Sequence, residues 1–151
     1  MRCLTLHLAL LLGLLAGTSP ASSEELACST KRRFKDGSSA GAALSLSVPN
    51  DRVTALRFSN FVSSGTPGGA YSCHVDTGAA DAKVRWKRKA TATEVTIGHK
   101  PEEQSIVIVH KTADGYRVSF ESMWSGHCGF GAEFPQHVEL RRGQRQCKVS
   151  D

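Results

Sequence analysis

The dipeptide His127-Cys128 places an imidazole beside a thiol, the two groups that a cysteine hydrolase uses as base and nucleophile. Such a thiol must be free and ionised, whereas cysteines of exported chains usually lie in disulfides. We therefore expect Cys128 to be disulfide-bonded and predict no catalytic residue. A secreted hydrolase that uses His127 or His137 as its base stays an alternative.

Other chemical patterns are weak. The histidines are scattered along the chain. No two of the five from His74 to His137 have the i,i+2 or i,i+4 spacing of a local metal site. Gly126, Gly129 and Gly131 are not framed by the strand and helix of a nucleotide-binding loop. We expect neither a metal nor another cofactor.

The strongest signal is electrostatic. Residues 83–89 read Lys-Val-Arg-Trp-Lys-Arg-Lys. On an extended strand Lys83, Arg85, Lys87 and Lys89 share one face, with Val84 and Trp86 on the other. This row predicts an anion-binding surface, although lysines along an edge strand also prevent edge-to-edge pairing.

Two further groups of bases lie near the ends of the chain. They are Lys31, Arg32, Arg33 and Lys35, and Arg141, Arg142, Arg145 and Lys148. The formal net charge of the whole chain is only +5, and no ladder of aromatic residues accompanies the bases. Nucleic acid is therefore a poor candidate partner, and an anionic envelope polymer or an acidic protein surface fits better.

A long connection, residues 122–136, combines glycines, a cysteine and large aromatic side chains. Connections of this length in small domains are usually functional or disordered, and aromatic residues argue against disorder. We predict that a partner binds here, because exposed aromatic side chains anchor interfaces. The predicted contact residues are Trp124, His127, Phe130, Glu133 and Phe134. The alternative is that Trp124 and Phe134 fold inward and fill one end of the core.

Period-two alternation of apolar and polar residues recurs from Ala42 to Val149, separated by turn residues such as Asp114-Gly115. The continuous apolar run from Ile106 to Val109 suits a strand covered on both faces. The pattern predicts an all-β chain, a small antiparallel β-barrel or β-sandwich of about eight strands. The first predicted strand begins near residue 42.

The first 21 residues have the features of a secretory signal: Arg2, an apolar run from Leu4 to Ala16, and small residues at 19–21. The run is too short to span a bilayer. We expect residues 22–151 to form a single β domain, exported to the periplasm or the exterior as a monomer without a membrane span. Cys28, Cys73, Cys128 and Cys147 would then form two disulfides, for which we favour the pairs Cys28–Cys73 and Cys128–Cys147.

These features together predict an exported, non-catalytic binding protein that contacts a protein or an anionic polymer. The signal, the size, the strand number and the disulfide-tied loop resemble the small exported β-barrel inhibitors of lysozyme. That resemblance implies inhibition of, or immunity to, a cell-wall hydrolase. A carrier that holds a small ligand inside a barrel is a further alternative.

Overall fold

The structure is a computed structural model that describes residues 23–66, 69–79, 83–129 and 132–150. The predicted signal segment 1–21 lies outside these residues. Ten antiparallel strands occur in the described part of the chain, together with two short 3₁₀ turns, η1 (Pro101–Glu103) and η2 (Ser125–His127). The strands are β1 (Ser23–Arg33), β2 (Ser39–Pro49), β3 (Ala55–Ser63), β4 (Ala70–Asp76), β5 (Val84–Arg88), β6 (Ala92–Ile97), β7 (Ser105–Lys111), β8 (Gly115–Ser122), β9 (His137–Arg141) and β10 (Lys148–Ser150).

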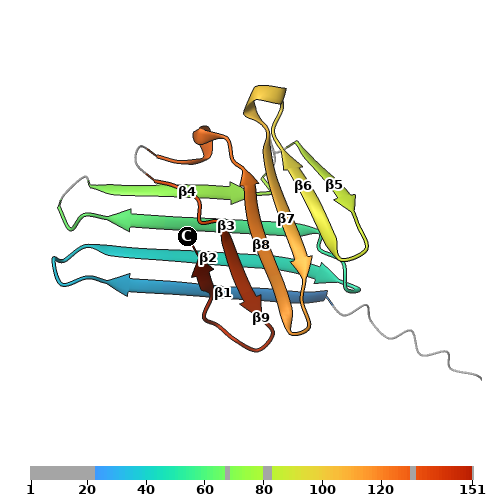
Figure 1. Cartoon of the computed structure of the whole chain (residues 1–151), viewed down its shortest axis with the longest axis horizontal. Helices are drawn as coiled ribbons and strands as arrows, with labels where there is room; N and C mark the ends of the chain where they lie inside the picture. The colour runs from blue at the N-terminus through green and yellow to red at the C-terminus, as the bar shows by residue number, and fades with distance from the viewer. Residues whose placement is uncertain (1–22, 67–68, 80–82, 130–131, 151) are drawn as a thin grey trace, which may run out of the picture.

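The strands form two sheets that are not closed into a barrel. One sheet has the order β1-β2-β3-β4, and the other has the order β10-β9-β8-β7-β6-β5. The strands of the two sheets cross steeply in Figure 1. The all-β class is confirmed, with ten strands in the described residues where the sequence predicted about eight.

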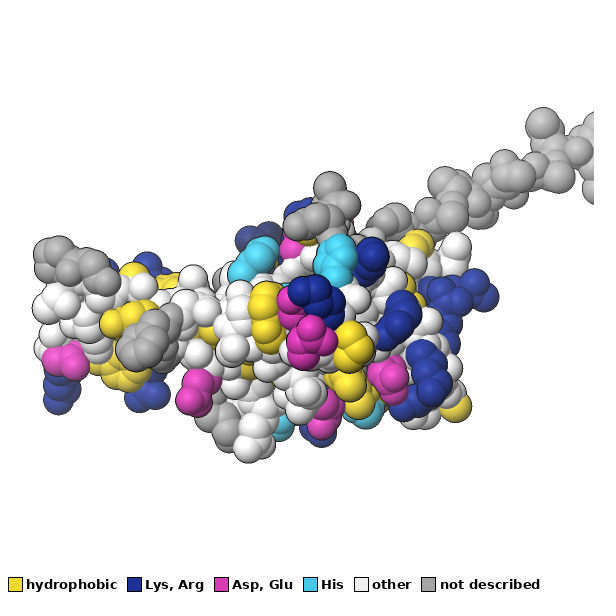
Figure 2. Space-filling view, turned by 90° about the horizontal axis from the view of Figure 1, so that it is seen from above, with side chains coloured by type: hydrophobic (Ala, Val, Ile, Leu, Met, Phe, Trp, Pro, Cys, Tyr) yellow, Lys and Arg dark blue, Asp and Glu magenta, His cyan; other side chains and the backbone are white. Residues whose placement is uncertain are grey.

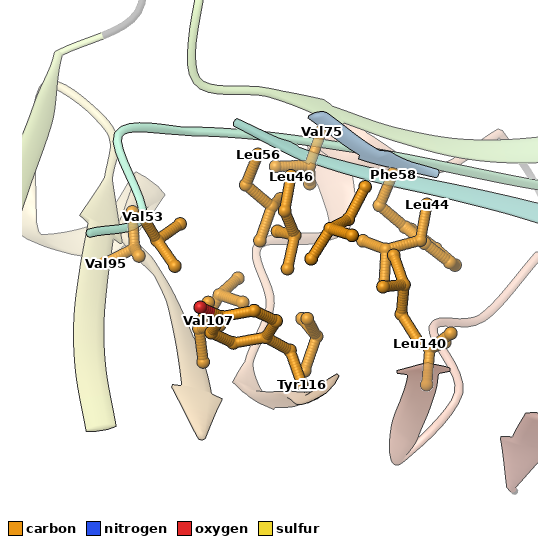
Figure 3. Close-up of a cluster of buried hydrophobic side chains, with 14 of the residues drawn as sticks. Leu44, Leu46, Val53, Leu56, Phe58, Val75, Val95, Val107, Tyr116 and Leu140 are labelled. Atoms are coloured by element: carbon orange, nitrogen blue, oxygen red, sulfur yellow. The ribbon is translucent and has the colours of Figure 1, made fainter. Parts of the chain in front are cut away.

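The core lies between the crossed sheets. Leu46, Leu56 and Phe58 from the first sheet are at most 1% exposed, and they face Val107 and Leu140 from the second, which are equally buried. Figure 3 shows these side chains pointing toward one another from the two sheets. The alternation seen in the sequence is therefore the alternation between this core and the two outer faces.

One prediction about the core is wrong. The run Ile106–Val109 was expected to be covered on both faces, but only Val107 and Val109 are buried in it. Ile106 and Ile108 are half-buried on the outer face of the second sheet. The β-branched residues suit a strand whether or not its second face is covered, so composition did not distinguish the two cases.

The favoured disulfide pairing is also wrong. The bonds are Cys28–Cys147 and Cys73–Cys128. The prediction failed because β1, which carries Cys28, was not recognised as a strand; in the structure Ser29 pairs with Gln146 and brings the C-terminal segment beside β1. Two disulfides indicate an oxidising, exported environment. Over the described residues, no helix has the length and apolar character needed to cross a membrane.

The strands of the first sheet extend beyond the area that the second sheet covers. Its β1–β2 and β3–β4 hairpins project well past β8 and β9, toward the left of Figure 1. We call this end of the first sheet the wing, defined by Lys31–Ala40 of the β1–β2 hairpin and by Val62 and Tyr71. Cross-strand register places Arg32, Ala40, Val62 and Tyr71 in one row on its inner face.

Candidate functional site

The connection that follows β8 is held at Trp124. Its backbone N–H donates to the hydroxyl of Ser105 at 2.9 Å, and Ser105 is fully buried in β7. The indole folds over Gly126, where a Cβ atom would lie 2.3 Å from the ring. Four residues beyond Trp124, the Cys73–Cys128 disulfide ties the chain to β4. Trp124 is nevertheless 39% exposed, so part of this residue faces solvent.

The second part of the connection turns inward. The Phe134 ring centroid lies 5.2 Å from that of Phe120 and 5.8 Å from that of Phe58, so Phe134 extends the core. The Asn60 amide donates to the carbonyl of Glu133 at 2.7 Å, which leaves the Glu133 side chain exposed. The alternative of inward folding therefore describes Phe134 and not Trp124. Phe130 lies outside the described residues.

His127 lies between these two aromatic residues. Its ring meets Trp124 edge-on at 5.6 Å and Phe134 edge-on at 6.5 Å between centroids. Its Nε2 atom is buried and hydrogen-bonds to no atom of the described residues. Burial, and secondarily electrostatic repulsion between its protonated form and the neighbouring His74, lower the pKa of His127 below its ordinary value of 6.5. The imidazole is accordingly neutral at neutral pH.

Trp124 and His127 form one wall of a hollow of about 260 Å³ where the end of β4 meets the start of β5. We call it the histidine hollow. Its other polar residues come from the end of β4, the start of β5 and the connection between β6 and β7. The polar and aromatic side chains at the hollow include His74, Asp76, Lys83, His99, Trp124 and His127.

The charges at the histidine hollow are unequally neutralised. Asp76 is paired with Arg57 at 3.0 Å. Glu103, also at the hollow, approaches Lys100 at 3.4 Å. Lys83 is exposed and forms no ion pair within the described residues. The hollow therefore combines an exposed indole with an exposed cation.

The predicted basic strand, residues 83–89, contains β5, with Lys83 and Lys89 just outside its ends, and the predicted alternation is confirmed. Lys83, Arg85, Lys87 and Lys89 are exposed, while Val84 and Trp86 pack against the core. β5 is an edge strand, as the alternative interpretation of these bases requires.

The far end of this basic row is partly neutralised by Glu94 on β6. The carboxylate lies opposite Lys87 in the register and accepts a hydrogen bond from Lys89 at 2.8 Å. The contact with Lys89, assisted by the charge of Lys87, lowers the pKa of Glu94. The start of the row is different, because Lys83 lies at the same hollow as Trp124 and His127. The structure thus joins the two surfaces that the sequence predicted separately.

The thiol hypothesis for Cys128 is wrong, because its sulfur is bonded to Cys73. The sequence also contains a Gly-x-Ser-x-Gly pattern, residues 37–41, which our sequence analysis missed. A nucleophile elbow joins a strand to a helix, whereas this segment runs from the β1–β2 turn into β2. Ser39 begins that strand, paired with Arg33 and Ser63, so the context of an elbow is missing.

Comparisons of the chain with protein-family models, with curated proteins and with solved structures find no match. The residues of the histidine hollow that sequence analysis did not nominate include His74, Asp76, His99 and Glu103. For His74 and Asp76 the only signal was the alternation along β4, which puts them on the face opposite Cys73 and Val75. Nothing local in the sequence linked them to Trp124.

Proposed function

We propose that this open β-sandwich is an exported, non-catalytic binding protein of the periplasm or the exterior, and that Trp124 is its central contact residue. The observation that carries the proposal is the partial exposure of Trp124, whose backbone N–H a buried hydroxyl binds and whose indole packs over Gly126. A ring that is already fixed loses little conformational entropy when a partner covers it. Large aromatic side chains of this kind dominate the free energy of many interfaces.

The chemistry beside Trp124 favours an anionic partner group. Lys83 supplies a cation within the same hollow, and His127 offers a neutral imidazole. An acidic loop of a protein and a segment of an anionic envelope polymer both present such a group next to a surface that an indole can cover. In this proposal the bases further along β5 act at longer range, by raising the rate of encounter.

Immobilised protein exposed to an envelope extract tests this proposal. Wild type, Trp124→Ala and the control Val62→Ala are compared, since Trp124 and Val62 are both exposed large hydrophobic residues but lie in different parts of the molecule. We expect Val62→Ala to retain what wild type retains, and Trp124→Ala to retain roughly tenfold less, the scale of an interface anchor. Equal retention by all three proteins would refute the contact surface.

Lys83→Glu tests whether the partner carries an anionic group, independently of whether it contacts Trp124. We expect reduced retention at low salt and a smaller further loss on raising the salt than wild type shows, because the attraction that salt screens has been removed. Retention that Lys83→Glu leaves unchanged while Trp124→Ala abolishes it would keep the binding site and reject the anionic group.

A further inference from the structure

The wing carries a dense group of bases at the tip of the β1–β2 hairpin. Lys31, Arg32 and Arg33 end β1, and Lys35 lies in the turn, all of them exposed. In the described parts of the chain none of the four forms an ion pair. The neighbouring acid Asp36 is engaged locally, by the backbone N–H of Ser38 at 2.9 Å and its hydroxyl at 2.6 Å.

The basic cluster near the C-terminus shows that bases of this chain need not stay unpaired. Arg142 contacts Glu24 at 3.0 Å, and Arg141 contacts Asp114 at 3.3 Å. The acids that pair with these arginines lie on β1 and in the β7–β8 turn. The bases of the wing have no such partners within the described residues, so their charge faces outward.

Exposed apolar side chains accompany the bases of the wing. Phe34 is 40% exposed and Val62 is 47% exposed, and with Trp124 they are the exposed large hydrophobic residues of the described chain. The Arg32 guanidinium lies 5.2 Å from the centre of the Phe34 ring. In Figure 2 some basic and hydrophobic side chains, together with an acidic one, are visible on this projecting end.

The placement of the bases indicates how a partner would approach. Strand alternation puts Lys31 and Arg33 on the outer face of the first sheet and Arg32 on the inner face, with Phe34 and Lys35 at the tip. A flat partner lying against one face would meet only part of this charge. A surface approached end-on by the hairpin meets all four bases around a central aromatic ring.

We propose that the β1–β2 hairpin tip binds the surface of an anionic lipid bilayer, with Phe34 entering the interface and the four bases contacting lipid headgroups. A bilayer provides both a plane of negative charge and an apolar layer beneath it, and reversible attachment needs two such contributions. A soluble polyanion would satisfy the bases but offers nothing to Phe34. This surface lies at the opposite end of the molecule from β5, so the proposal is independent of the function proposed above (Figure 1).

Sedimentation with lipid vesicles tests the proposal. The probes are vesicles of phosphatidylcholine alone and vesicles made of equal parts of phosphatidylcholine and phosphatidylglycerol. We expect wild type to bind only the anionic vesicles, and the binding to weaken as salt is raised. Phe34→Ala should weaken the binding about fivefold, because interfacial insertion scales with the apolar area buried.

The chain offers a matched control for charge. Arg33→Glu with Lys35→Glu alters the wing, and Arg85→Glu with Lys87→Glu makes the same change in net charge on β5. We expect the first pair to abolish vesicle binding and the second to leave it within about twofold, because electrostatic attraction falls off within a Debye length. Thermal unfolding of each variant, monitored by circular dichroism, verifies that it is folded.

Several results would overturn the proposal. They are the absence of binding to anionic vesicles, equal losses in the two charge-reversed pairs, and binding that Phe34→Ala does not weaken. Binding to soluble dextran sulfate without binding to anionic vesicles would likewise reject the bilayer and assign the tip to a polyanion.

Discussion

The two ends of the first sheet are built from the same four strands, but their inner faces carry different kinds of side chain. At the covered end the strands present Leu26, Leu46 and Leu56 to the second sheet, each 7% exposed or less. At the wing the same face presents Arg32, Ala40, Val62 and Tyr71. The period of two continues without interruption, so the difference lies in what covers the sheet and not in how the backbone folds.

The boundary between the two ends is the connection after β8. Cys128 is bonded to Cys73, and the carbonyl of Glu133 is bound by Asn60 on the same inner face. In the next row toward the tip, Arg32 and Val62 are exposed, while Ala40 and Tyr71 are half-buried. Within the described residues, the connection that carries Trp124 therefore also marks the end of the core.

Removing the disulfide at this boundary should give the largest effect. In the chain-entropy model a bond that closes 55 residues stabilises the fold by about 4 kcal/mol. We expect Cys73→Ala with Cys128→Ala to lower the free energy of unfolding in urea by roughly that amount. Acrylamide should then quench Trp124 more readily. Unchanged quenching in the folded variant would show that Ser105 and Gly126 hold the indole without the disulfide.

Matched truncations on the inner face compare the two ends directly. Leu46→Ala at the covered end should cost about 3 kcal/mol of unfolding free energy, because it leaves a cavity in a closed core. Val62→Ala on the wing should cost less than about 0.5 kcal/mol, as for an exposed position. Urea denaturation measures both values. A large cost at Val62 would mean that the wing is part of a packed assembly.

A second comparison lies within the connection itself. Phe134→Ala should lower the free energy of unfolding by about 2 kcal/mol, since the ring packs on Phe58 and Phe120 at the edge of the core. Trp124→Ala should cost less, about 1 kcal/mol or below, because much of its ring faces outward. The reverse order, measured by urea unfolding, would identify Trp124 as the structural residue of the pair.

The smallest effect concerns pH. The pKa of His127 is lowered in the folded chain, so the unfolded chain binds this proton at a higher pH. Its contribution to stability is complete above pH 6.5, declines as the pH falls below that value, and levels off below the lowered pKa. We expect His127→Gln to show a shallower loss of unfolding free energy on acidification. His110→Gln, outside the hollow, is the control for the replacement of a histidine by glutamine.

Local patterns predicted most of the fold. Alternation and turn residues located β2, β3 and β4, and Asp114-Gly115 marked the hairpin between β7 and β8. They missed β1, because the bases after Cys28 conceal its alternation and its polar face is solvent-exposed. That omission also produced the wrong disulfide pairs, since pairing depends on which segments lie side by side.

The candidate site was predictable in its parts and not as a whole. Residue type and loop length nominated Trp124, and charge spacing nominated Lys83. Their meeting at one hollow depends on the crossing of two sheets, which no local pattern encodes. Trp124 packs over the nearby Gly126 and stays partly exposed, whereas Phe134 packs against Phe58 of the first sheet. The second contact joins residues that are distant in the sequence, so a local pattern could not predict it.

The most direct test of the central claim is the fluorescence of Trp124 itself. Trp86 is the only other tryptophan, so Trp86→Phe leaves Trp124 as the sole reporter. Acrylamide quenching of this variant is measured alone and after saturation with the material that the immobilised protein retains from an envelope extract. Our account predicts that bound material shields the indole and reduces the quenching severalfold. Quenching that stays the same in the bound state would contradict it, because the partner would then be held elsewhere.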